Sequence, residues 1–341
     1  MSNSVWLWNL LVFAGSAAAL LIVRLVLRGP AGPRLRRMLR EPVPLACLAI
    51  VALFLLFAIA DLVELPGESG AARSLLDLAF SGTNVERSYS APFAERALVG
   101  SLEDPNAEEN QLRSFHLLGT DVNGYDVIYS VCKGSRTALL LVLGAMLVSF
   151  PLGLVLGILG GYAGGWIDDV VQWLYNTIAS IPWLLFVIGF LVLFGRELVW
   201  IALAFGLTSW VELARLARGE TLRLREESFV RAARALGTPV RRILARHILP
   251  NLAHVSIFSF TTTATSIVLA ESVLTFIGIG VRPGSASWGR MLVEAQTELL
   301  RSPPIWWVFS GAAFLGVLPL VVSLNILGER LREILMPESY D

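Results

Sequence analysis

The segment from Glu227 to Asn251, ESFVRAARALGTPVRRILARHILPN, holds the residue types and spacing that best indicate a function. It is polar and rich in arginine, although long apolar runs flank it on both sides. Ser228 is expected to cap a first helix through its hydroxyl, and Gly237 to end that helix in a left-handed conformation. Thr238 is expected to cap a second helix that begins at the following proline, and Pro250 to restart the chain beyond it. Two short helices with a small-residue surface predict docking on another protein. The plainer alternative is an ordinary helical hairpin between two apolar segments.

Sequence motifs for nucleotide binding and for catalysis are absent. The chain has no G-x-x-x-x-G-K-[ST] phosphate loop, no G-x-S-x-G, no H-E-x-x-H and no C-x-x-C. Its two cysteines and three histidines lack a spacing typical of metal ligands. We therefore predict no catalytic residue, no cofactor and no metal for this chain, and no nucleotide binding of the phosphate-loop kind.

The composition is that of a membrane protein. The 341 residues are 55% hydrophobic and 16% charged, whereas a typical soluble domain is about 25% charged. Apolar runs of about 20 residues indicate membrane spans. The formal net charge is zero, so the chain has no overall positive charge that would favour a nucleic-acid partner. We therefore predict the lipid bilayer as the surroundings of this chain.

Six apolar runs form the predicted core of spans, with Pro182 expected to kink or break the third. The runs are residues 44–62, 137–159, 170–194, 198–216, 252–275 and 305–327. A seventh run, Val5 to Val23, is followed by a cluster of arginines, which mark the cytoplasmic side of a span. We favour a span for this run over a helix lying in the membrane interface.

The predicted orientation places the arginine-rich segment in the cytoplasm. Nine arginines lie between Arg215 and Arg246, in agreement with the positive-inside rule. The polar segment from Glu64 to Arg136 then lies outside. The turn from Gly161 to Asp169 is also placed inside, but its charged residues are both aspartates.

The arginine-rich segment resembles the EAA cytoplasmic coupling loop of ABC importer permeases, in the form typical of the dipeptide, oligopeptide and nickel branch. The matching positions are Ala232, Ala233, Gly237, Leu249 and Pro250. Arg231 stands where the family pattern opens with glutamate. The resemblance implies that a loop at residues 218–250 contacts the ATPase, with Glu227 and His247 also in the contact.

Three further stretches extend the resemblance over about residues 42–337. The first stretch is HLLGTDVNGYDV at 116–127, which departs from the family pattern at Leu117 and Tyr125. The second is GGYAGGWIDDVVQWLYNTIASIP at 160–182, which departs at Trp173 and Asn176. LAESVLTFIGIGVRPGSASWGRMLVEA at 269–295 includes Glu271, an ionisable group near a span. Such a group lines a pathway or gate, or serves as a hydrogen-bonded strut between helices. The further pathway candidates are Thr262 and Ser266.

The resemblance implies an all-α polytopic membrane protein with the six-helix core of type I ABC importers, plus one extra N-terminal span. Residues 1–41 would hold the extra span and an arginine-rich linker, 42–136 the first core span and an external loop, 137–337 the permease core, and 338–341 a tail. The implied location is the bacterial inner membrane, with the coupling loop and the C-terminus in the cytoplasm.

The implied function is that of the permease subunit of an ATP-driven importer. Its partners would be a second homologous permease, ABC ATP-binding subunits that carry the ATPase, and an extracytoplasmic binding protein that delivers a peptide or related small solute. Relatives carry dipeptides, longer peptides, nickel chelates, glutathione and peptide antibiotics, so the solute stays open. A secondary transporter driven by an ion gradient is the alternative, although the chain shows no internal repeat.

Overall fold

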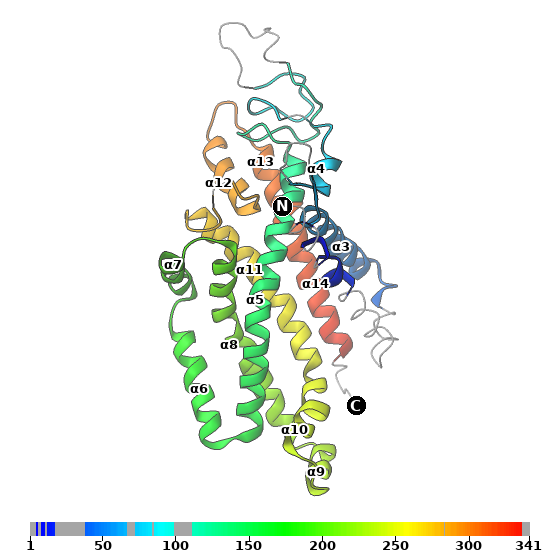
Figure 1. Cartoon of the computed structure of the whole chain (residues 1–341), viewed down its shortest axis with the longest axis vertical. Coiled ribbons are helices and arrows are strands. Elements are labelled where there is room, and N and C mark those ends of the chain that lie inside the picture. The colour runs from blue at the N-terminus through cyan, green and yellow to red at the C-terminus, as the bar shows by residue number, and fades with distance from the viewer. Residues whose placement is uncertain are drawn as a thin grey trace. The chain divides into compact units, whose positions relative to one another are not determined.

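The computed structural model describes residues 5, 8–10, 12–17, 38–66, 72–83, 85–98, 111–282 and 284–335 (Figure 1). The chain divides into two compact units. Unit 1 contains residues 1–139 and 268–323, and unit 2 contains residues 140–267 and 324–341. Three helices continue from one unit into the other: α5 (Val127–Ala163), α11 (Ala253–Phe276) and α14 (Leu318–Leu335).

Within the described residues, five helices are long and apolar enough to cross a membrane, and a sixth span is possible if one bent pair is counted. This confirms the predicted polytopic helical fold. Two of the five are α3 (Pro42–Leu62) and α8 (Leu198–Arg225), and the third is α5. The fourth, Val240–Phe276, joins α10 (Val240–Ile243), η2 (Leu244–Ile248), η3 (Leu249–Leu252) and α11. The fifth, Trp307–Ile334, joins α13 (Trp307–Ser310), η4 (Gly311–Val317) and most of α14.

The bent pair consists of α6 (Gly165–Ser180) and α7 (Trp183–Phe194), whose axes meet at 82°. The break lies where the sequence predicts it, at Pro182. Ile181 has an extended backbone, φ −85° and ψ 123°, because a residue that precedes proline is disfavoured in the helical region. The predicted third span is therefore two helices at a sharp angle.

Two helices begin earlier than the apolar runs suggest. α5 begins at Val127, ten residues before Thr137, because the Asp126 side chain accepts the N–H groups of Ile128 (2.7 Å) and Tyr129 (3.2 Å) and so caps the helix. α6 begins at Gly165, which makes the turn after α5 shorter than the predicted one. Hydropathy locates the apolar centre of a helix but not its polar ends.

Residues 63–126 of unit 1, which we call the polar lobe, contain a small two-stranded sheet that the all-α expectation did not include. Strand β1 (Glu64–Pro66) pairs antiparallel with β2 (Ala72–Ser74). Helix α4 (Leu75–Ala79) follows, with a capping box between Ser74 and Asp77. Asp77 also accepts hydrogen bonds from Lys133 (2.5 Å) and Tyr129 (2.7 Å) of α5, which attach the lobe to that helix.

The N-terminal run, Val5 to Val23, is described only in part, at residues 5, 8–10 and 12–17, and most of the arginines that follow it lie outside the described residues. Two described residues of this run contact the end of α3. Trp8 donates to the carbonyl of Leu62 (2.7 Å), and the Asn9 side chain exchanges hydrogen bonds with the backbone of Glu64 (2.6 and 2.9 Å). The expected seventh span remains a prediction.

Candidate functional site

The candidate coupling segment, residues 227–252, begins with α9 (Ser228–Ala235). The residue at its N-cap is Glu227, not Ser228 as the sequence suggested, and no side chain caps the helix. Glu227 has an extended backbone, and its carbonyl accepts the N–H groups of Val230 and Arg231. Its carboxylate accepts a 3.0 Å hydrogen bond from Arg223 of α8. Glu227 therefore connects the end of α8 to the start of α9.

Gly237 ends α9 in the left-handed conformation that its residue type suggested. Its φ is +71°. The N–H of Thr238 donates to Ala233 (3.1 Å), and the N–H of Gly237 donates to Arg234 (3.0 Å). This pair of bonds is the Schellman motif, which satisfies the last carbonyls of a helix. The chain therefore turns sharply between α9 and the next helix.

The second helix of the segment differs from the sequence expectation in two ways. Its N-cap is Pro239 rather than Thr238, and α10 spans Val240–Ile243. Pro250 does not restart the chain, because α10 continues through η2 (Leu244–Ile248) and η3 (Leu249–Leu252) into α11. Since proline lacks an N–H group, the helix accommodates it with π and 3-10 turns instead of a break. A force on α10 therefore acts directly on a long apolar helix.

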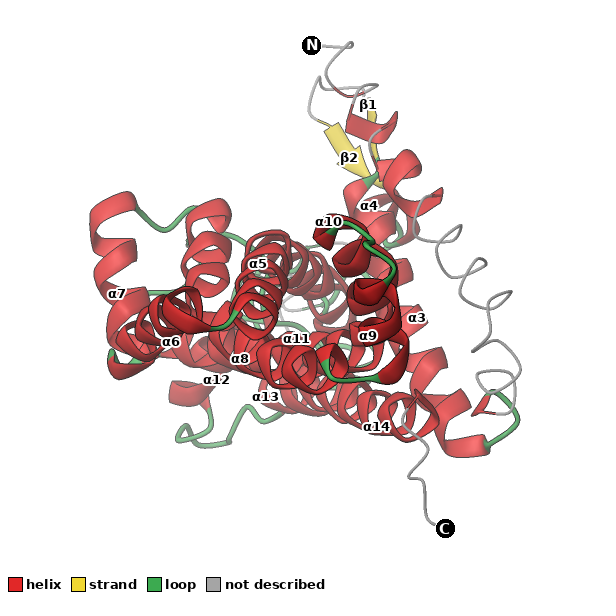
Figure 2. Cartoon of the chain, turned by 90° about the horizontal axis from the view of Figure 1, so that it is seen from below, coloured by secondary structure: helices red, strands yellow, loops and turns green. Residues whose placement is uncertain are grey.

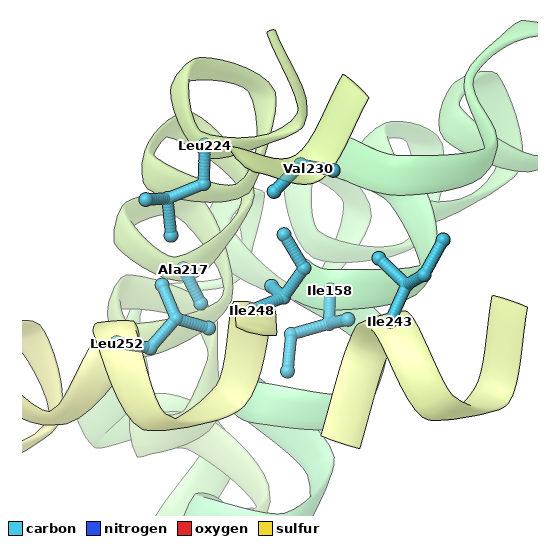
Figure 3. Packing of buried hydrophobic residues seen from close by; sticks show 7 residues of the cluster. All are labelled: Ile158, Ala217, Leu224, Val230, Ile243, Ile248 and Leu252. Carbon is cyan, nitrogen blue, oxygen red and sulfur yellow. The ribbon is translucent and has the colours of Figure 1, made fainter. Parts of the chain in front are cut away.

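A buried cluster holds the segment against α5 and α8 within unit 2 (Figure 3). Val230 of α9 and Ile243 of α10 point into it, together with residues from the neighbouring helices. Its seven members are Ile158, Ala217, Leu224, Val230, Ile243, Ile248 and Leu252. Ala233 packs on the edge of this cluster, and the Arg234 guanidinium lies 5.5 Å from the centre of the Tyr162 ring, within cation–π range. The segment is therefore anchored by one face.

The rest of the segment's surface is exposed and partly apolar. Figure 2 shows α9 and α10 from below, with these helices toward the viewer. Leu236, at the end of α9, is 85% exposed. Phe229, Val240 and Leu249 are also exposed large apolar side chains. Ala232 lies on this exposed side, whereas Ala233 is half-buried toward the cluster. The two alanines of the sequence motif therefore serve different faces.

Leu236 and Phe229 were not among the residues that the sequence analysis selected. Helical periodicity does not single them out, because Phe229, Ala233 and Leu236 stand at the i, i+4 and i+7 spacing of one helical stripe, so only the structure shows that the first and the last are exposed. The same segment carries five exposed arginines, at positions 231, 234, 241, 242 and 246. Exposed apolar side chains on a segment that also carries charge are typical of a protein-binding surface.

The other predicted residues of the segment lie close to this face. The His247 ring lies 6.0 Å from the Phe229 ring, so α9 and η2 are in contact there. Asn251 donates to the His247 carbonyl (2.6 Å). Leu249 and Pro250 open η3 and are exposed.

Glu271 of α11 lies in unit 1 and is buried, with 6% of its surface exposed. Thr275, one turn later, donates to its carboxylate (2.8 Å). The side chain of Ser287 and the backbone of Gly289 also hydrogen-bond to it. Both belong to the start of α12 (Trp288–Glu298), whose N-cap is Ser287. Glu271 thus links the end of α11 to the start of α12.

The two hydroxyl candidates of α11 lie in unit 2. Thr262 donates to the carbonyls of Phe258 (3.0 Å) and Ser259 (3.2 Å) of its own helix. Ser266 lies on the exposed side of α11. Glu271 belongs to the other unit.

The HLLGTDVNGYDV stretch forms tight turns at the base of the polar lobe. Gly119 and Gly124 have φ of +71° and +78°. The Asp121 carboxylate accepts the N–H groups of Asn123 (2.9 Å) and Tyr125 (3.0 Å). Burial raises the pKa of Asp121 to about 6 in spite of these hydrogen bonds. His116 is fully buried, and its Nδ1 lies 2.9 Å from Asp126, the residue that caps α5.

Among the described residues, no group of three or more histidine, cysteine, aspartate or glutamate side chains has the geometry to hold a metal ion. Cys47 and Cys132 are free and buried.

Comparison with known proteins gives a consistent set of relatives. A family model described as "Binding-protein-dependent transport system inner membrane component" matches residues 153–338. The oligopeptide transport system permease protein OppC of Haemophilus influenzae is 33% identical over 227 residues, 67% of this chain and 72% of that protein. The dipeptide transport system permease protein DppC of Bacillus subtilis is 34% identical, over 65% of this chain and 69% of that protein. The glutathione transport system permease protein GsiD of Pectobacterium atrosepticum is 33% identical, over 66% and 73%.

Proposed function

This chain belongs to the family of binding-protein-dependent transport system inner membrane components and is an ABC importer permease, and we propose that its cargo is a peptide. The relatives above are named for oligopeptides, dipeptides and glutathione, which are all peptides. The chain is a multi-pass protein of the inner membrane. We place the α9–α10 segment in the cytoplasm, since the arginines that surround it favour that side of a bilayer.

The proposed mechanism couples ATP hydrolysis on partner subunits to movement of the spans. The exposed face around Leu236 docks on an ABC ATP-binding subunit, while Val230 and Ile243 hold the opposite face to α5 and α8. Because α10 is continuous with α11, a push on the segment tilts a helix that runs to Phe276. This is rigid-body switching between outward and inward access. The two-faced α9–α10 segment is the observation that carries the proposal.

The remaining parts receive roles consistent with this mechanism. We propose a second homologous permease as the other half of the pathway and an extracytoplasmic binding protein as the source of cargo. Thr262 and Ser266 are pathway candidates. Glu271 is assigned to the strut alternative rather than to a gate, because its carboxylate is engaged by Thr275, Ser287 and Gly289.

The experiment is uptake of labelled di- to pentapeptides into vesicles that contain the complete transporter. We expect uptake to require ATP together with the binding protein. Uptake driven by an ion gradient without ATP would contradict the proposal and favour the secondary transporter. ATP-dependent uptake of a different solute class, with peptides excluded, would overturn the cargo assignment alone.

A further inference from the structure

Helices α5 and α8 are in backbone contact along a row of glycines within unit 2. A Cβ atom built on Gly153 would lie 2.9 Å from the Leu213 side chain. On Gly157 it would lie 2.7 Å from the carbonyl of Ala214, and on Gly161 it would lie 2.7 Å from the carbonyl of Arg218. Glycines at four-residue spacing allow helices to approach this closely. We call this contact the glycine seam.

An ion pair closes the end of the seam. Asp168, in the first turn of α6, accepts hydrogen bonds from Nε (2.5 Å) and Nη2 (2.6 Å) of Arg218 on α8. Both side chains are largely buried, at 14% and 22% exposed. Such a two-point contact fixes the orientation of both groups as well as their distance. Arg225 of α8 also donates to the Gly161 carbonyl (3.2 Å).

This ion pair accounts for Asp168, one of the two aspartates in a turn that the positive-inside rule would expect to carry arginine or lysine. Asp168 is neutralised locally by the arginine of α8. Ala217, the neighbour of Arg218, belongs to the cluster that holds Val230 of α9. The ion pair, the glycine seam and the cluster that anchors the coupling segment therefore all involve the part of α8 from Leu213 to Leu224.

We propose that Asp168 and Arg218 are positioning residues for coupling: they lock the α5–α6 turn to α8, so that α5, α8 and the α9–α10 segment move as one rigid lever. The inference rests on the proposed function of that segment. Without this ion pair, the end of α5 and the start of α6 would move relative to α8 when the ATP-binding subunit displaces α9. The spans would then be displaced less for the same movement of α9.

The test uses Asp168→Asn, which removes the charge, and Arg218→Lys, which keeps the charge but loses the two-point geometry. In vesicles with the complete transporter, peptide imported per ATP hydrolysed is expected to fall at least about fivefold, the lower end of typical coupling between sites. The charge swap Asp168→Arg with Arg218→Asp is expected to recover part of the loss. Glu333→Gln, which breaks the exposed Arg330–Glu333 pair, is the control and should leave the ratio unchanged.

Two outcomes distinguish failure of the Asp168–Arg218 lock from failure of the proposed function. An unchanged import-to-ATP ratio in assembled Asp168→Asn and Arg218→Lys complexes would overturn the lock. No ATP-dependent peptide uptake by the unaltered transporter would instead contradict the proposed function.

A second measurement does not depend on how these variants fold. Spin labels on cysteines at Trp166, in the first turn of α6, and at Leu236 report the distance between the start of α6 and the coupling segment, after Cys47 and Cys132 are replaced. A rigid lever predicts the same distance distribution with and without ATP. A shift of that distribution on ATP binding would overturn the inference.

Discussion

The indole Nε1–H of Trp288 donates a 2.8 Å hydrogen bond to the carbonyl oxygen of Val131, inside helix α5. The ring is almost fully buried, and Phe54 of α3 meets it edge-on at 5.3 Å between centroids. Gly134 and Gly316 leave the space that the ring occupies, since a Cβ on either would lie 2.6 or 2.8 Å from it. One side chain of α12 thus joins three other elements of unit 1.

This packing predicts that Gly134→Ala destabilises the protein. The added methyl must displace the Trp288 ring, and overpacking of this kind costs about 1–3 kcal/mol. The measurement is thermal unfolding of the purified protein in detergent. Gly189→Ala in α7 is the matched control, because no atom lies within 4 Å of its added Cβ. Equal unfolding midpoints for the two variants would contradict the tight packing around Trp288.

The raised pKa of Asp121, about 6 through burial, predicts a pH dependence of stability. The folded protein favours the protonated carboxyl, because the folded pKa exceeds the unfolded value of about 3.9. The contribution of Asp121 to the free energy of unfolding is therefore fully present below about pH 4 and is lost as the pH rises through about 6. Asp121→Asn keeps an oxygen for the two backbone N–H groups but cannot ionise. We expect the free energy of unfolding of Asp121→Asn, relative to that of the unaltered protein, to rise from pH 4 to pH 7 by a few kcal/mol at most.

Asp77→Asn is the control for this titration. Burial opposes ionisation of Asp77, but hydrogen bonds from Lys133, Tyr129 and the Ser74 backbone lower its pKa to about 2. Its contribution is therefore lost only as the pH falls below about 4. Unfolding midpoints across the pH 4–7 window should shift by a constant amount in this variant. A constant shift in Asp121→Asn as well would show that Asp121 does not titrate there.

Gly237→Pro is expected to uncouple ATP hydrolysis from transport while the protein still inserts. Proline fixes φ near −65°, whereas Gly237 has φ +71° and donates its N–H to Arg234. Gly237→Ala should have a milder effect, since a left-handed residue costs about 1–2 kcal/mol. Gly219→Ala in α8 is the control, because its Cβ would meet no atom within 4 Å. Normal peptide import per ATP by Gly237→Pro would argue against a role for this turn.

Glu271→Gln distinguishes a strut from a gate. Glutamine retains a carbonyl oxygen to accept the Thr275 hydroxyl but carries no charge. The strut assignment predicts near-normal import by Glu271→Gln, and loss of stability and import by Glu271→Ala, which leaves the partners at Ser287 and Gly289 unsatisfied. Loss of import by Glu271→Gln at normal stability would show instead that the charge itself is needed.

The sequence contained enough information for the spans and for the left-handed turn at Gly237. Apolar runs marked all six predicted spans, and the break at Pro182 followed from the steric effect of proline. The left-handed turn at Gly237 was also predictable, because few residues other than glycine adopt it without cost. These features depend on local chemistry, which sequence patterns report directly.

The rest depends on contacts between residues far apart in the chain. The Asp168–Arg218 ion pair joins positions 50 residues apart, and no pattern pointed to it. The assignment of Ala233 to the buried face and of Ala232 to the exposed face needed the cluster around Val230. The caps expected at Ser228 and Thr238 failed because Glu227 and Pro239 occupy the N-cap positions. Hydroxyl residues favour caps, but the neighbouring turn geometry decides which residue takes the position.

The most direct test of the central claim is cross-linking from the exposed face of the coupling segment in the assembled transporter. A cysteine at Leu236, 85% exposed on α9, is predicted to cross-link to an ABC ATP-binding subunit with a short bifunctional reagent. The yield should change when ATP is bound. A cysteine at Leu193, 80% exposed on the apolar helix α7, is predicted to give no such product. Cross-linking of the ATP-binding subunit from Leu193 but not from Leu236 would contradict the account.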